Sequence, residues 1–263
     1  MIKAEWYFEY ELQKNRPGLL GDISSLLGML SINIMTINGV ENNRRGLLLL
    51  CKNEQQIMRL SAILTMVDDI KVTKLRRATL RDKLAVRHGR YIHRDIIDHK
   101  TVKFVRDELG LLVDYLAELC KTDDHLLIGV RGMPRVGKTE SIVAASVCAN
   151  KRWVFVSSTL LKQTVRQELI ADEYSSESIF IIDGIVSKQR ASDKHWELIR
   201  EIMRQQAVKI VEHPDIFIRE TEYSIDDFDH IIELRRTKDE KITYETYEQT
   251  LLTDSENYSM YDF

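Results

Sequence analysis

Hydrophobic and polar positions alternate in the first stretch of the chain and then recur at helical spacing. The segment EWYFEYEL, Glu5 to Leu12, is apolar at every second position, which predicts a strand with one buried face. After the turn NRPG, residues 15–18, leucine and isoleucine recur every three or four residues up to Leu30, which predicts a helix. Later segments predict, in order, a strand, a strand, a helix and a strand: 32–39, 46–52, 57–67 and 70–75. The order βαββαβ predicts a ferredoxin-like plait.

The segment RPGLLGDISSLLGMLSINIMTI, residues 16–37, resembles the opening of an ACT domain, a small regulatory module that binds amino acids. The resemblance covers about residues 3–80 and implies an ACT-like domain over 1–80 with an amino-acid effector. Asn15 and Ser31 depart from the residues that the family often has, an acid and a glycine. The implied ligand residues are Asn15, Pro17, Gly18, Leu19 and Asn33. Without a ligand, RPG would serve only as a tight turn between a strand and a helix.

A basic stretch follows this first domain. Residues 71–90 carry eight lysines and arginines against the single acid Asp82. We interpret them as the last strand and a solvated connector, and binding of nucleic acid is the alternative.

Apolar residues at steps of three and four then predict one helix with a narrow apolar stripe. The stripe consists of Val102, Val105, Leu109, Leu112, Leu116 and Leu119. Such a stripe packs either on the same chain or on a second copy in a dimer. Because ACT modules commonly pair, we expect a homodimer. Residues 81–122 are therefore assigned to the basic connector and this helix.

A strand, a glycine-containing loop and a helix follow one another from His125 to Asn150. The loop has the form Gly132-x4-Gly137-Lys138-Thr139, which cradles nucleotide phosphates when it stands between a strand and a helix. Glycine lets backbone N–H groups approach phosphate oxygens, lysine reaches the terminal phosphates, and the threonine hydroxyl binds Mg²⁺. The candidate nucleotide-binding residues are Gly132, Arg135, Val136, Gly137, Lys138, Thr139 and Glu140.

A second element supports Mg²⁺ binding. In SIFIIDGI, Asp183 ends an apolar strand, as does the carboxylate that holds Mg²⁺ in P-loop proteins. Its alternative interpretation is an Asp-Gly turn after a buried strand. Further strands are predicted at 152–158 and 207–213, with 215–221 as a candidate fifth. Helical connections predict a compact parallel α/β domain of P-loop NTPase type over 123–236.

Catalysis is less well defined by the sequence. Gly184 follows Asp183, so no adjacent glutamate can activate water, and we expect at most slow hydrolysis. The catalytic candidates are Asp183 and the helical pair Arg200 and Arg204, and the alternative role of the two arginines is that of solvated surface charges. The leading hypothesis is a regulatory protein that binds ATP or GTP with Mg²⁺ and senses a small molecule. A P-loop kinase of small molecules and a nucleic-acid-associated ATPase remain alternatives.

Composition limits the location and the partners. The 263 residues include no apolar run long enough for a bilayer, so no membrane contact is expected. Three isolated cysteines and an amino terminus without a secretory signal predict a cytoplasmic protein. A net charge of −3 argues against bulk nucleic-acid binding. Residues 237–263 are predicted to form an acidic, tyrosine-rich tail. The whole arrangement resembles a functionally uncharacterised YmfK-like family of bacterial proteins.

Overall fold

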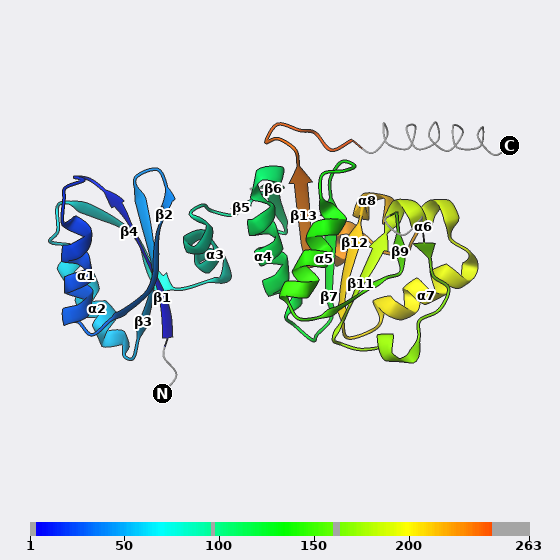
Figure 1. Ribbon diagram of the computed structural model, residues 1–263, viewed down its shortest axis with the longest axis horizontal. Helices are drawn as coiled ribbons and strands as arrows, with labels where there is room; N and C mark the ends of the chain where they lie inside the picture. Colours follow the sequence, from blue (N-terminus) through cyan, green and yellow to red (C-terminus); the bar gives the residue numbers. More distant parts are fainter. Residues whose placement is uncertain (1–3, 96–97, 160–163, 244–263) are drawn as a thin grey trace. The chain divides into compact units, whose positions relative to one another are not determined.

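The computed structural model describes residues 4–95, 98–159 and 164–243. The chain divides into two compact units, Met1–Ile92 and His93–Phe263 (Figure 1). Among the described residues, no helix is both long and apolar enough to cross a membrane. From residue 244 onward, the predicted acidic tail lies outside the described residues.

The first unit is a four-stranded antiparallel sheet with helices on both faces (Figure 1). Its elements are β1 (Ala4–Leu12), α1 (Leu19–Met29), β2 (Asn33–Glu41), β3 (Arg44–Cys51), α2 (Glu54–Leu64), β4 (Ile70–Arg77) and α3 (Leu80–His88). The predicted βαββαβ order is confirmed, and the strands lie in the order β2-β3-β1-β4.

Strand β1 is buried on both faces, so the expectation of one buried face is wrong. Phe8 and Tyr10 belong to the core that also contains the apolar residues of α1 and α2. Tyr7, on the opposite face, packs with Ala85 and Val86 of α3. The prediction was wrong because it assumed that the second face of β1 is exposed to solvent, whereas α3 covers it.

Helix α3 also corrects the interpretation of residues 71–90 as a solvated connector. Thr79 and Asp82 form a capping box at its start, with the Thr79 N–H donating to Asp82 Oδ2 at 2.9 Å. The helix packs against β2 and β3, and Leu84, Ala85 and Val86 are buried. The basic stretch is therefore strand and helix of the first unit.

The second unit contains a seven-stranded sheet in the order β5-β6-β13-β7-β12-β11-β8. All its pairs are parallel except β5 with β6, so the predicted parallel α/β sheet is confirmed. Its strands are β5 (His93–Arg94), β6 (Thr101–Val105), β7 (Leu126–Arg131), β8 (Arg152–Phe155), β11 (Ser178–Asp183), β12 (Val208–Glu212) and β13 (His230–Arg235). Strands β9 (Ser157–Ser158) and β10 (Thr164–Val165) form a separate pair.

The helices of this unit connect the strands. They are α4 (Leu109–Cys120), α5 (Lys138–Cys148), α6 (Gly184–Arg190), α7 (Asp193–Met203) and α8 (Pro214–Phe217), with short 3-10 turns η1 (Arg106–Glu108), η2 (Ala171–Glu173) and η3 (Ile225–Asp227). Helices α4 and α5 pack against each other (Figure 1).

Two predictions about these elements are wrong. The apolar stripe predicted one helix from Val102, but Val102 and Val105 lie in β6, which pairs with β13. A short strand that is buried on both faces shows no alternation of apolar and polar residues. The apolar residues of β6 therefore continued, by chance, the spacing of three and four residues that belongs to α4. The buried side chains of α4 are Leu111, Leu112, Tyr115, Leu116, Ala117 and Cys120, so Leu112 and Leu116 of the stripe pack within the chain.

The segment 215–221 was the candidate fifth strand. Pro214 instead begins the short helix α8, in which its missing N–H costs nothing at the first turn. The strand that completes the parallel sheet is β13, which the sequence analysis missed.

The close packing beneath β7 can be tested at Gly129. A Cβ at this position would lie 2.7 Å from Ile231 Cδ1 and 3.0 Å from Pro214 Cγ. We expect Gly129→Ala to lower the free energy of unfolding by about 1–3 kcal/mol through overpacking. The control is Gly110→Ala in α4, where a Cβ would meet nothing within 4 Å. Urea denaturation of both variants measures the difference, and equal stabilities would contradict the packing.

Candidate functional site

Three neighbouring parallel strands end at one edge of the second sheet, and the candidate residues lie at this edge. Strand register pairs Glu212 with Val130 near the end of β7 and with Asp183 at the end of β11. The loop 132–137 leaves β7 at the same edge and leads into α5. Ligands of open parallel sheets bind outside the carboxyl ends of the strands, so this edge is where a site is expected.

The loop has a backbone that few residue types can adopt. Gly137 caps α5 with φ at 107°, in the left-handed region, and Arg135 also lies there with φ at 58°. At Gly132 a Cβ would lie 2.6 Å from the carbonyl oxygen of Leu234, so only glycine fits beside β13. Val136 is fully buried, whereas Arg135 and Glu140 are exposed. Residues with a left-handed backbone conformation in such loops point successive N–H groups to one side of the loop. This arrangement is called a nest and binds anions.

Lys138 folds back over this loop. Its ammonium group donates to the carbonyl oxygens of Gly132 at 2.9 Å and Met133 at 3.1 Å, and only 6% of the residue is exposed. Burial lowers the pKa of Lys138, while the charges of Glu212, Asp183 and Glu140 oppose this shift. The cation is thus held next to the loop by carbonyl groups and by nearby carboxylates.

Glu212 is a site residue that the sequence analysis missed. The Thr139 hydroxyl donates to Glu212 Oε1 at 2.6 Å, across 73 residues of sequence. Burial raises the pKa of Glu212 to about 7, the charge of Asp183 raises it further, and Lys138 and Thr139 oppose the shift. The signal was present in AVKIVEH, in which a carboxylate ends a buried strand just as Asp183 does.

Asp183 has a structural role in addition to its place at the edge. Its Oδ1 accepts the N–H groups of Ile185 at 3.0 Å and Val186 at 3.2 Å, so it caps α6. Burial raises the pKa of Asp183, whereas these hydrogen bonds and the charge of Lys138 lower it. The Asp-Gly turn that was the alternative interpretation is therefore the start of a helix.

Two arginines that the sequence analysis did not single out contact the loop. Arg106 donates to the carbonyl oxygen of Arg135 at 3.3 Å, and Arg236 donates to that of Pro134 at 3.0 Å. They come from the segments that follow β6 and β13, which are distant in sequence. Only the strand order β6-β13-β7 brings them to the loop.

The arginine pair Arg200 and Arg204 is not brought to the loop. Both are exposed on or just after α7, whose buried residues include Ile199 and Met203, as predicted. The chain from Arg204 leads into the start of β12, where Ala207 accepts the N–H of Leu126 at the start of β7. This is the amino edge of the sheet, opposite to Lys138 and Glu212.

In the first unit, the implied ACT ligand residues do not form one cluster within the chain. Asn15, Pro17 and Gly18 are exposed before α1, and Gly18 caps that helix with φ at 85°, while Leu19 is buried. Asn33 begins β2, beyond the other end of α1. The 11 residues of α1, about 16 Å in length, lie between the two places in the chain, and the amino-acid site stays a prediction.

Comparison with known proteins gives a family. The family described as "Protein of unknown function (DUF3388)" matches residues 72–261. The chain is 67% identical over 263 residues to "Uncharacterized protein YmfK" of Bacillus subtilis (strain 168), covering 100% of this chain and 98% of that protein. The chain belongs to this family. The resemblance to YmfK-like proteins is thereby confirmed.

One solved structure aligns with this chain along most of its length. It is the phospho-2-dehydro-3-deoxyheptonate aldolase (DAHP synthase) of Thermotoga maritima, with 12% identity and coverage of 99% of this chain and 98% of that chain. Its TM-score is 0.21, which is too low to support an argument about fold or function.

The raised pKa of Glu212 predicts a pH dependence of stability. A carboxyl whose pKa rises from 4.5 to about 7 on folding stabilises the native state when protonated, and this contribution is lost as the pH rises toward 7. Between pH 5 and 8 we expect the free energy of unfolding to fall by about 1–3 kcal/mol more in the native protein than in Glu212→Gln.

The control for this experiment is Glu197→Gln, which removes the same charge from an exposed position of α7. Denaturant unfolding at each pH gives the three profiles. Parallel profiles for the native protein and Glu212→Gln would show that this carboxyl titrates alike in the folded and unfolded states.

Proposed function

We propose that this protein binds ATP or GTP with Mg²⁺ at the loop from Gly132 to Thr139 and acts as a regulatory nucleotide-binding protein. The observation that carries the proposal is the hydrogen bond from Thr139 to Glu212, beside the buried ammonium of Lys138. It joins a hydroxyl in the first turn of a helix to a carboxylate at the end of the neighbouring strand. Such a helix start, next to a lysine, suits phosphate groups.

The charges around the loop favour a polyanion over a neutral ligand. Lys138, Arg106 and Arg236 all donate to carbonyl oxygens of the loop, so three cations lie beside it. Nucleotide phosphates would replace carbonyl oxygens as acceptors for these groups. The N-terminal end of α5 adds positive potential at the same place.

The oxygen donors at this edge fit Mg²⁺. Thr139 supplies a hydroxyl and Asp183 supplies a carboxylate, and Mg²⁺ prefers oxygen ligands. No group of three or more His, Cys, Asp or Glu residues in the described part of the chain could hold a metal by itself. A bound Mg²⁺ would therefore take its remaining ligands from water and from phosphate oxygens, as it does in most nucleotide sites.

Glu212 also bears on turnover. A general base works best when its pKa is near the working pH, and the pKa of Glu212 is raised to about 7. Since Gly184 rather than glutamate follows Asp183, Glu212 is the residue we assign to orient or activate water in a slow hydrolysis. The regulatory role that we propose further includes sensing of a small molecule by the first unit.

Lys138→Ala tests the phosphate site. We expect this variant to bind ATP and GTP with Mg²⁺ at least about tenfold more weakly, because a charge-assisted hydrogen bond to phosphate is lost. Calorimetry against both triphosphates and their diphosphates, with and without Mg²⁺, measures the change. Lys194→Ala, at an exposed position of α7, removes an equal charge and serves as the control. Unchanged affinity in a folded Lys138→Ala protein would remove the basis of the proposal.

Asp183→Asn separates binding of the metal from capping of the helix. Asparagine is a good N-cap, so the hydrogen bonds to Ile185 and Val186 have an acceptor in the variant. We expect the gain in nucleotide affinity that Mg²⁺ confers to fall by about tenfold while the metal-free affinity stays constant. The same calorimetric titrations measure both quantities. If both affinities fall equally, Asp183 acts only as a cap.

A further inference from the structure

The face of the first sheet that α3 covers holds a buried charge. Glu9 is fully buried on β1, and its carboxylate accepts hydrogen bonds from Tyr7 at 2.6 Å and Thr73 at 2.6 Å, as well as from Tyr91. The Lys74 ammonium lies 3.0 Å from the same group. Burial opposes ionisation, but these four donors outweigh it and lower the pKa of Glu9 to about 2.

A β-bulge in β4 assembles this group. The register pairs Glu9 with Lys74 and Tyr10 with Val72, so Thr73 is an extra residue in β4. Both Thr73 and Lys74 thereby reach the carboxylate of Glu9, at 2.6 and 3.0 Å. Bulges re-aim side chains and are frequent beside functional sites.

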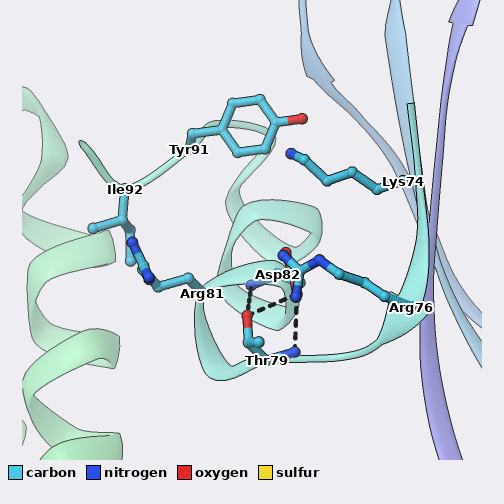
Figure 2. Close-up of a pocket in the computed structure, with 7 residues that line it drawn as sticks. All are labelled: Lys74, Arg76, Thr79, Arg81, Asp82, Tyr91 and Ile92. Carbon is cyan, nitrogen blue, oxygen red and sulfur yellow. Dashed lines mark hydrogen bonds and ion pairs between the residues drawn. The ribbon is translucent and has the colours of Figure 1, made fainter. Parts of the chain in front are cut away.

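A cavity of about 240 Å³ lies next to these residues. The residues of its wall come from β4, from α3 with its N-cap, and from the segment that follows α3, and they are Lys74, Arg76, Thr79, Arg81, Asp82, Tyr91 and Ile92. Figure 2 shows Lys74 and Arg76 extending from β4 toward α3, with the Tyr91 hydroxyl pointing toward the Lys74 ammonium. The cavity is smaller than the roughly 300–1,000 Å³ of sites for drug-sized ligands.

The charge of the wall is positive. It holds the three cations Lys74, Arg76 and Arg81 against the one carboxylate of Asp82, and Glu9 lies behind the wall in an ion pair with Lys74. Both oxygens of that carboxylate are engaged, Oδ1 by Arg76 at 2.8 Å and Oδ2 by Thr79. An incoming cation would meet repulsion and no unengaged carboxylate oxygen of Asp82, so the wall selects against cations.

Arg76 has donors left for a ligand. A guanidinium carries five N–H groups. Within the described residues, the hydrogen bonds of this guanidinium go to Asp82 at 2.8 Å and to the carbonyl oxygen of Arg77 at 3.5 Å. Because the capping box fixes Asp82, and Asp82 in turn holds Arg76, the remaining donors are positioned in advance.

We propose that this cavity, formed by Lys74, Arg76, Arg81 and Tyr91, binds a small organic anion that carries carboxylate or phosphate groups. The apolar walls of Tyr91 and Ile92 accommodate its carbon skeleton, and the lysine and arginines bind its charged groups. The site is independent of the proposed nucleotide site and differs in place from the residues around Gly18. It gives the basic stretch 71–90 a role as the wall of a pocket rather than as a nucleic-acid surface.

The test uses the full chain with Lys138→Ala, so that anions bind less tightly at the loop 132–137. Citrate and pyrophosphate serve as probes in calorimetry at constant ionic strength. Arg81→Glu reverses one cation of the wall, and a glutamate in the first turn of α3 is favourable for that helix. Arg59→Glu makes the same charge change at an exposed position of α2, away from the cavity. Arg76→Gln is a second variant that keeps hydrogen-bonding capacity.

We expect at least one probe to bind with a stoichiometry of one. Arg81→Glu and Arg76→Gln should each weaken it about tenfold or more, with Arg59→Glu within about twofold. Two results would overturn the proposal: binding of neither anion, or equal weakening by Arg59→Glu and Arg81→Glu. Equal weakening, together with binding of a DNA oligonucleotide, would identify a diffuse basic surface in place of a pocket.

Discussion

The ammonium group of Lys138 is almost completely withdrawn from water, and a buried cation needs partners that replace its hydration. The loop carbonyl groups of Gly132 and Met133 supply hydrogen bonds, and the carboxylates of Glu212 and Asp183 supply opposite charge. This requirement fixes much else in the second unit. The loop must turn back through left-handed residues, and the carboxylates must end β12, the neighbour of β7, and β11, the strand beyond it.

The same constraint gives the edge of the sheet its chemistry. Two buried carboxylates whose charges act on each other and on one lysine cannot all be charged without cost, and the pKa of Glu212 rises to about 7 as a result of burial and of the charge of Asp183. A ligand that brings phosphates and a divalent cation would supply charges of both signs to this cluster. The nucleotide proposal therefore explains why the protein retains several charged groups where an apolar core would be more stable.

The first unit buries charge in a different way. Glu9 is surrounded by four donors, and its partner Lys74 also faces the cavity under α3. Helix α3 is thus more than a cover for the sheet, because it contributes Arg81 and Asp82 to a wall whose other cations come from β4. Each unit therefore places several cations from separate elements around a small volume, in the first unit under α3 and in the second at the loop 132–137.

The amino-acid sequence alone determined two kinds of feature. One is the helices and strands whose apolar residues recur at a regular spacing, and the other is the glycine–lysine–threonine loop, whose residues lie close together in the chain. The order βαββαβ, the strand–loop–helix around Gly132 to Thr139, and the parallel strands that carry Asp183 and Glu212 follow from short-range patterns. Tertiary structure decided what depends on neighbours distant in sequence. Val102 is a strand residue because β13 pairs with it, and residues 80–88 form a packed helix because the sheet face above Tyr7 needs a cover.

The candidate site divides in the same way. Gly137, Lys138 and Thr139 are recognisable because one turn of chain holds them together. Glu212 joins them only because β12 lies between β7 and β11, and Arg106 and Arg236 join them only because β6 and β13 lie on the other side of β7. Arg200 and Arg204 lie at the opposite edge because β12 runs from the amino ends of the strands, where α7 finishes, to their carboxyl ends, where Glu212 lies. Strand order is set by the burial of both sheet faces over the whole unit, and no local spacing in the sequence encodes it.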